Sequence, residues 1–137
     1  MPVPPTYHGE VDDGLQRVLG DLEDYTAAAV QLRDELDRLI AWNAEDAEYL
    51  RSGMAITDSM RRADSARRSR DLTRYLDEFE SVRRAVRVSV TALMLDDGNT
   101  VTEVGDAFGV SRQLAHRFAT DRSATGGPAG PTEEVGP

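Results

Sequence analysis

The sequence predicts an all-α protein: a long N-terminal helical hairpin or coiled-coil segment, followed by a C-terminal three-helix domain. Three observations support this. Apolar residues recur at steps of three and four along residues 15–39 and again along 72–93, the spacing of one side of a helix. Between 101 and 120, two short amphipathic segments flank Gly109.

The composition sets limits on the protein's class. With 137 residues and 39% hydrophobic residues, the chain is too apolar for a disordered protein and has the size of one domain, or of a small domain with a helical appendage. The absence of cysteine excludes disulfides, a thiol nucleophile and thiolate metal sites. No apolar run is long enough to span a bilayer and no signal-peptide core is present, so we expect a cytoplasmic protein. All sixteen basic residues are Arg, which indicates a GC-rich genome such as an actinobacterial one.

The net charge of −9 is unevenly distributed. Residues 1–50 contain twelve acidic residues and three Arg, whereas residues 51–90 contain six acidic residues and ten Arg. The charge is therefore polarised along the chain, which is compatible with nucleic-acid binding despite the overall negative charge.

Residues 1–11 are rich in Pro and are expected to form a disordered arm. A helix is expected from about Asp12 to Ser52-Gly53, within a helical coiled-coil or dimerisation region over 12–70. Its apolar seam consists of Leu15, Val18, Leu22, Tyr25, Ala29, Leu32, Leu36 and Leu39. In a parallel dimer the flanking residues Asp21, Ala28 and Glu35 would face no opposite charge on the other helix, so an antiparallel hairpin or four-helix bundle is favoured over a parallel zipper. The seam can pair within one chain or join two copies, and we expect a homodimer. Trp42 is expected to be a core residue at the end of the bundle.

A second long helix is expected from Thr57 to Leu95, ending before Gly98. Its first half is polar and Arg-rich, and the acid-to-Arg spacing of four residues predicts ion pairs on a solvated face: Asp58 to Arg62, Asp64 to Arg68 and Glu80 to Arg84. Its second half is amphipathic and begins a domain predicted over 71–122. The Gly- and Pro-rich residues 123–137 are expected to form a disordered tail.

The segment 101–120 has local signals for two helices. Thr100 and Glu103 have the spacing of a capping box, and Ser111 can cap the second helix. Gly105 permits close helix approach, and Gly109 suits a left-handed turn residue. At 100° per residue, one arc of the second helix contains only polar side chains, namely those of Arg112, Gln113, His116, Arg117 and Thr120.

This segment resembles the helix-turn-helix of sigma-factor and resolvase-type C-terminal domains. The resemblance is carried by Val104, Gly105, Phe108, Gly109, Val110 and the run Ser111-Arg112-Gln113. Most members of that family have Ala at the position of Gly105 and a branched apolar residue at that of Ala115. The resemblance implies binding to double-stranded DNA through Thr102, Ser111, Arg112, Gln113, His116 and Arg117. Arg83, Arg84 and Arg87 are additional candidates for phosphate contacts.

The sequence thus predicts a dimeric, sequence-specific DNA-binding transcriptional regulator. The dimer contacts are expected from Leu15, Val18, Leu22, Tyr25, Leu32, Leu36 and Leu39. The alternative is a protein-docking adaptor or anti-sigma-like partner, with the acidic N-terminal helix as a binding surface. The polar arc of the second helix favours DNA, because a docking face should carry large apolar groups. The only histidines are His8 and His116, and no catalytic triad, metal-ligand cluster or phosphate-binding glycine loop is present, so we expect no enzyme activity, metal or cofactor.

Overall fold

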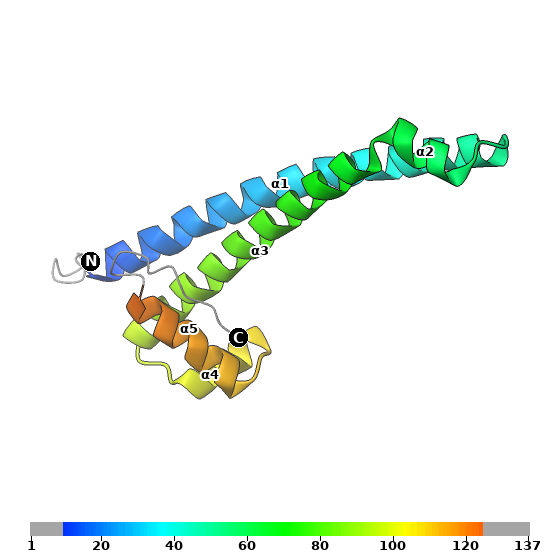
Figure 1. The fold of residues 1–137 in the computed structure, drawn as a ribbon. Coiled ribbons are helices and arrows are strands. Elements are labelled where there is room, and N and C mark those ends of the chain that lie inside the picture. Colours follow the sequence, from blue (N-terminus) through cyan, green and yellow to red (C-terminus); the bar gives the residue numbers. More distant parts are fainter. Residues whose placement is uncertain (1–9, 125–137) are drawn as a thin grey trace. The chain divides into compact units, whose positions relative to one another are not determined.

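A computed structural model describes residues 10–124, and the regular structure in that range is entirely helical (Figure 1). The helices are α1 (Glu10–Arg51), α2 (Ile56–Ala63), α3 (Ser65–Asp96), α4 (Val101–Phe108) and α5 (Arg112–Ala124). The predicted all-α class is confirmed. Within the described range, no helix is both long enough and apolar enough to cross a membrane. The predicted disordered arm (1–11) and tail (123–137) lie outside the described residues, except at their inner edges, where 10–11 and 123–124 are helical.

The chain divides into two compact units, and each unit contains a part of α1 and a part of α3. The hairpin unit is Glu23–Arg83; the terminal unit is the chain up to Leu22 together with the chain from Arg84 onward. These divisions differ from the predicted boundary between residues 70 and 71. The start of α1 belongs to the terminal unit because it packs on the end of α3: a Cβ on Gly14 would lie only 3.2 Å from Leu93 Cδ1.

In the hairpin unit, α1 packs against α3 along a row that only partly coincides with the predicted seam. The rings of Tyr25 and Phe79 lie 5.3 Å apart. Ala28 and Glu35 are buried, whereas their neighbours Ala29 and Leu36, which the seam prediction placed inside, are exposed.

The prediction of one continuous seam is therefore corrected. Three of its seven proposed dimer residues are exposed, namely Leu15, Leu22 and Leu36. The other four are buried or half-buried within the chain: Val18, Tyr25, Leu32 and Leu39. The physical reason is that apolar residues flank the seam, so a spacing of three and four fits two adjacent rows of α1 equally well.

Glu35 places a carboxylate inside the hairpin unit, with its side chain only 4% exposed. Arg38 donates two hydrogen bonds to Glu35 Oε1, from Nε at 3.2 Å and Nη2 at 3.0 Å. Hydrogen bonding to Glu35 raises the pKa of the Arg38 guanidinium, which keeps that side chain charged.

Replacing this buried carboxylate should stabilise the hairpin unit. The cost of removing a carboxylate from water is often not recovered by its ion pair, and apolar replacements are commonly neutral or stabilising. Glu35→Leu should raise the urea midpoint reported by the fluorescence of Trp42, the only tryptophan of the chain, whereas Arg38→Ala should lower it. A lower midpoint for Glu35→Leu would show that the ion pair stabilises the hairpin more than apolar packing can.

The helical structure is interrupted twice between α1 and α3, once after α1 and once between α2 and α3. The break predicted at Ser52-Gly53 is confirmed, with Gly53 at φ 104°. The prediction of one continuous helix from Thr57 to Leu95 is wrong, because Asp64 adopts a left-handed conformation (φ 52°, ψ 54°) between α2 and α3. Its N–H donates to the Arg61 carbonyl, and Asp tolerates this conformation better than most residues.

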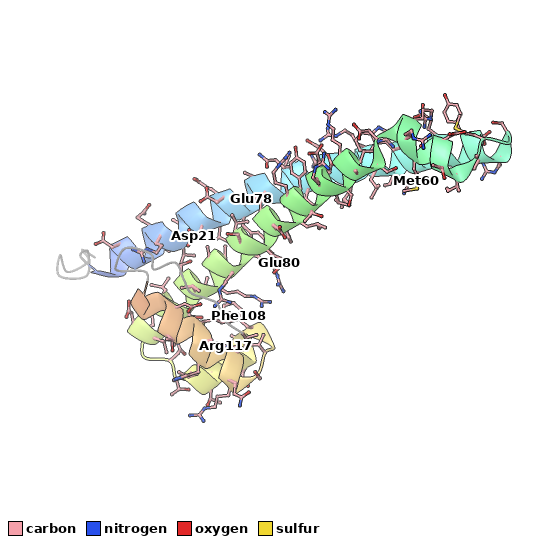
Figure 2. All side chains as sticks on the ribbon, viewed as in Figure 1. Asp21, Met60, Glu78, Glu80, Phe108 and Arg117 are labelled. Carbon is pink, nitrogen blue, oxygen red and sulfur yellow. The ribbon has the colours of Figure 1, made fainter. Side chains whose placement is uncertain are left out.

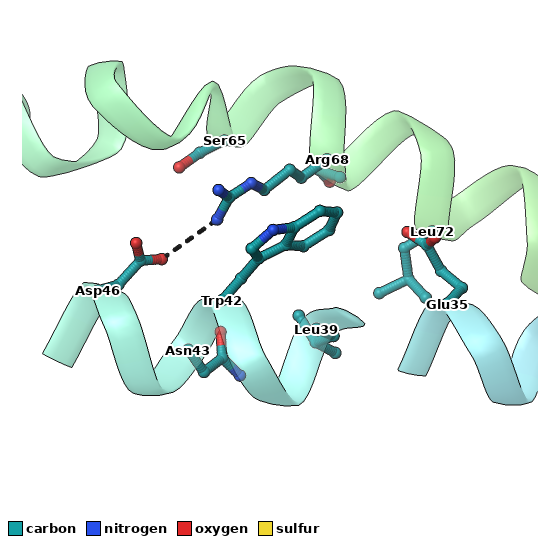
Figure 3. Close-up of a pocket in the computed structure, with 9 residues that line it drawn as sticks. Glu35, Leu39, Trp42, Asn43, Asp46, Ser65, Arg68 and Leu72 are labelled. Carbon is teal, nitrogen blue, oxygen red and sulfur yellow. Dashed lines mark ion pairs between the residues drawn. The ribbon is translucent and has the colours of Figure 1, made fainter. Parts of the chain in front are cut away.

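Two arginines, Arg62 of α2 and Arg68 of α3, connect their helices to α1 through Asp46. Figure 3 shows the ion pair that Arg68 makes. Arg68 lies 4.2 Å from the centroid of the Trp42 ring and 3.5 Å from Asp46. Arg62 lies 3.9 Å from the centroid of the Tyr49 ring and donates to Asp46 Oδ1 at 2.8 Å. Trp42 is half-buried here, so its predicted core position is confirmed only in part.

The four-residue ion pairs predicted for these arginines do not form. Arg62 and Arg68 pair with Asp46 instead of Asp58 and Asp64, because the opposite helix offers an aromatic face as well as a carboxylate. Glu80 pairs with Arg83 rather than with the predicted Arg84.

The terminal unit contains the most completely buried side chains in the described part of the molecule. Val104 and Ala115 are 0% exposed and Phe118 is 1% exposed. The rings of Phe108 and Phe118 form a T-shaped pair with their centroids 5.9 Å apart. α3 adds further buried residues to this unit, namely Val86, Val88, Ser89 and Thr91. This core fixes the position of α5 and hence of the polar side chains on its outer face.

Candidate nucleic-acid interface

The start of α4 is fixed by a reciprocal pair of hydrogen bonds. Thr100 Oγ1 accepts from the Glu103 N–H at 3.1 Å, and Glu103 Oε1 accepts from the Thr100 N–H at 2.7 Å. The predicted capping box is confirmed. It satisfies two backbone N–H groups that would otherwise lack a helical partner.

The turn between α4 and α5 also follows the local sequence. Gly109 ends α4 in the left-handed region (φ 70°, ψ 34°), and the Val110 N–H donates to the Gly105 carbonyl at 3.0 Å. Ser111 Oγ accepts from the Leu114 N–H at 3.1 Å, so the predicted cap of α5 is confirmed. These bonds fix the direction in which α5 leaves the turn.

Close approach of the two helices depends on Gly105. A Cβ there would lie 3.2 Å from the Val110 carbonyl oxygen and 3.6 Å from Ala115 Cβ. Gly105 and Ala115 therefore face each other and leave room for the turn.

Gly109 offers a simple test of the turn geometry. A Cβ at this position would meet no atom within 4 Å, so a substitution acts only through the backbone conformation. Gly109→Ala should lower the free energy of unfolding of the terminal unit by about 1–2 kcal/mol. Gly109→Asn should cost clearly less, because Asn populates the left-handed region more readily. Urea unfolding followed by circular dichroism measures both; equal costs would mean that the turn does not impose the left-handed conformation.

The outward side of α5 carries four exposed polar side chains, which we call the recognition face: Arg112, Gln113, His116 and Arg117. Together they border one open hollow on the surface. Figure 2 shows the side chains, with Arg117 labelled on this helix and Phe108 on α4. Thr120, predicted in the same arc, uses its hydroxyl to donate to the His116 carbonyl at 3.0 Å. Residues Leu114, Ala115, Phe118 and Ala119 are buried or half-buried, as predicted for the opposite arc.

The arginines of the recognition face differ from most others in their pairing. Arg61, Arg74 and Arg83 each contact an acid three residues earlier, at 3.2–3.3 Å. Within the part of the chain that the structure describes, no acidic side chain pairs with Arg112 or Arg117. Their guanidinium groups are therefore available to a ligand.

The other predicted DNA contacts are placed differently. Thr102 is exposed on the first turn of α4, and Ser111 is exposed but uses its hydroxyl in the α5 cap. Arg83 pairs with Glu80 and Arg84 with Asp121, so both are already neutralised. Arg87 lies 5.9 Å and 5.8 Å from the ring centroids of Phe108 and Phe118.

Asp121 was not anticipated from the sequence. It follows Arg117 by four residues, a spacing that predicts an ion pair between the two side chains. In the structure its carboxylate pairs instead with Arg84 on α3. This pairing leaves Arg117 free. Among the described residues, no group of three or more potential ligands from His, Asp and Glu could hold a metal ion.

Neither a protein-family model, nor a curated protein, nor a solved structure matches this chain.

Proposed function

We propose that the protein is a sequence-specific, double-stranded DNA-binding transcriptional regulator, in which α4, the turn at Gly109 and α5 form a helix-turn-helix. In this proposal α5 enters the major groove, as the second helix of such motifs does. The hydrogen bonds at Thr100, Gly109 and Ser111 support it, because they define the start of α4, the turn and the start of α5.

The observation that carries the proposal is the chemistry of the recognition face. Arg112 and Gln113 lie on the first turn of α5, where side chains of a recognition helix meet base edges. Arg can donate two hydrogen bonds to guanine, and Gln can pair with the adenine edge. Arg117 is one turn further along and suits a phosphate contact, which adds affinity without base preference.

A protein-docking role for α5 is disfavoured by the same residues. Docking faces concentrate aromatic and other large apolar anchors, whereas every residue of the recognition face is polar or charged.

A binding titration tests the proposal. Fluorescently labelled random and genomic duplexes are titrated with the full chain, with and without unlabelled competitor DNA, over a range of salt concentrations. We expect saturable binding in which log K falls linearly with log salt, by about 0.9 for each phosphate contacted. Absence of duplex binding at low salt, where electrostatic attraction is strongest, would refute the proposal and favour the docking role.

A further inference from the structure

A hollow of about 260 Å³ lies between α1 and α3 inside the hairpin unit, where α3 begins (Figure 3). Ser65 and Ser69 line it from α3, and Trp42 lines it from α1. The two serines are four residues apart and therefore lie on the same side of α3. Because their side chains are small, α3 does not fill the space next to Trp42. Sites for drug-sized ligands commonly measure about 300–1,000 Å³, so this hollow suits a smaller organic molecule.

The hollow has in its wall a carboxylate whose hydrogen bonding is incomplete. Glu35 lines the hollow, and its side chain is only 4% exposed. Both hydrogen bonds from Arg38 go to Glu35 Oε1. Among the described residues no group donates to Oε2, although a carboxylate accepts hydrogen bonds at both oxygens. Glu35 therefore offers an acceptor to a molecule in the hollow.

The other walls provide apolar surface and two hydroxyl groups. Leu39, Leu72 and the half-buried Trp42 supply the apolar surface. The hydroxyl groups of Ser65 and Ser69 form no hydrogen bond with other residues in the described part of the chain. A ligand that combines a small apolar body with a polar group matches these walls.

The charges at the hollow favour a cation over an anion. Asp46 and Arg68 both line the hollow, but they pair with each other at 3.5 Å. Glu35 is the remaining charged residue of the lining, and its partner Arg38 lies outside the lining with a side chain that is 50% exposed to water. An anion would meet the second oxygen of Glu35 at close range, whereas an ammonium group would donate a charge-assisted hydrogen bond to it.

We propose that this hollow binds a small amphipathic amine. The ammonium group donates to Glu35 Oε2, and the apolar body of the molecule lies against Leu39, Leu72 and Trp42. This role explains why the chain has a buried carboxylate at a position where Glu35→Leu is expected to raise stability, since binding sites commonly retain residues that lower stability.

The proposal is tested on the full chain without DNA, so its failure leaves the proposed DNA binding standing, and the reverse also holds. Benzylamine, benzyl alcohol and benzoate share one ring and differ in the charge of the head group, and n-butylamine and 1-butanol form a smaller aliphatic pair. Each probe is titrated at neutral pH while the fluorescence of Trp42, the only tryptophan, is followed with excitation at the red edge of its absorption band. We expect a saturable change with the amines and none with benzoate. Each alcohol should have a dissociation constant at least about 10-fold higher than its amine, because the hydrogen bond to Glu35 is no longer charge-assisted at both ends.

Two variants and a matched control locate the binding site. Glu35→Gln should weaken amine binding by about 10-fold or more and leave alcohol binding nearly unchanged, a selective loss that a folding defect would not produce. Ser69→Leu should fill the hollow and abolish binding of every probe. Glu78→Gln, exposed on α3 in the hairpin unit and outside the lining, removes the same charge as Glu35→Gln and should bind like the unaltered chain. Helical circular dichroism confirms that each variant is folded.

Three results would overturn the proposal. The first is that neither amine gives a saturable change or binds more tightly than its alcohol. The second is that Glu35→Gln binds the amines as tightly as the unaltered chain. The third is that Ser69→Leu continues to bind them, which would place the amine outside the hollow.

Discussion

Phe118→Ala should lower the free energy of unfolding of the terminal unit by about 3–5 kcal/mol, the usual cost of removing a fully buried phenyl ring. Phe118 is 1% exposed, its ring forms a T-shaped pair with Phe108, and the Arg84 guanidinium carbon lies 5.7 Å from the Phe118 ring centroid. The neighbouring Val104 and Ala115 have no solvent exposure. Since small domains are commonly stable by only about 5–15 kcal/mol, this loss should unfold α4 and α5 in mild denaturant.

The two units can be followed separately, because Trp42 is the only tryptophan and lies in the hairpin unit. Phe118→Ala should shift the urea transition in helical circular dichroism while leaving the fluorescence transition of Trp42 in place. Phe118→Leu, which retains most of the apolar volume, should cost clearly less. If the two signals instead shift together, the units unfold as one cooperative structure.

Arg112→Ala and Gln113→Ala should each weaken binding to the preferred duplex by about 1–3 kcal/mol and relax base preference at one position. The structure leaves both side chains exposed at the start of α5. Arg117→Ala should weaken binding to all duplexes alike and reduce the slope of log K against log salt by about one.

Arg70→Ala is the matched control for charge in a fluorescence-anisotropy titration. Arg70 is exposed on α3 in the hairpin unit, so its removal changes the net charge by the same amount without touching α5. It should leave binding nearly unchanged. Equal weakening by Arg70→Ala and Arg112→Ala would show that binding follows net charge alone.

Local signals were the most predictable features of this chain. The capping box at Thr100, the left-handed Gly109 and the cap at Ser111 each depend on residues within four positions of one another, and all three are confirmed. The polar arc of α5 follows from helical periodicity alone. The general position of the candidate interface could therefore be predicted before any tertiary contact was known.

Features that depend on distant residues were predicted poorly. The choice between Glu35 and Leu36 as the buried residue depends on where α3 lies, which periodicity does not specify. The pairing of Arg62 and Arg68 with Asp46 requires two helices that are separate in sequence. The left-handed Asp64 has no flanking glycine or proline to mark the break.

The central claim, that the recognition face selects a DNA sequence, is tested most directly by selection from a pool of random duplexes. The full chain and the triple variant Arg112→Ala, Gln113→Ala, His116→Ala are used in parallel, with circular dichroism to confirm that both are folded. We predict that the full chain enriches one sequence motif and that the folded triple variant enriches none. Enrichment of the same motif by both proteins, or of none by the full chain, would contradict the claim.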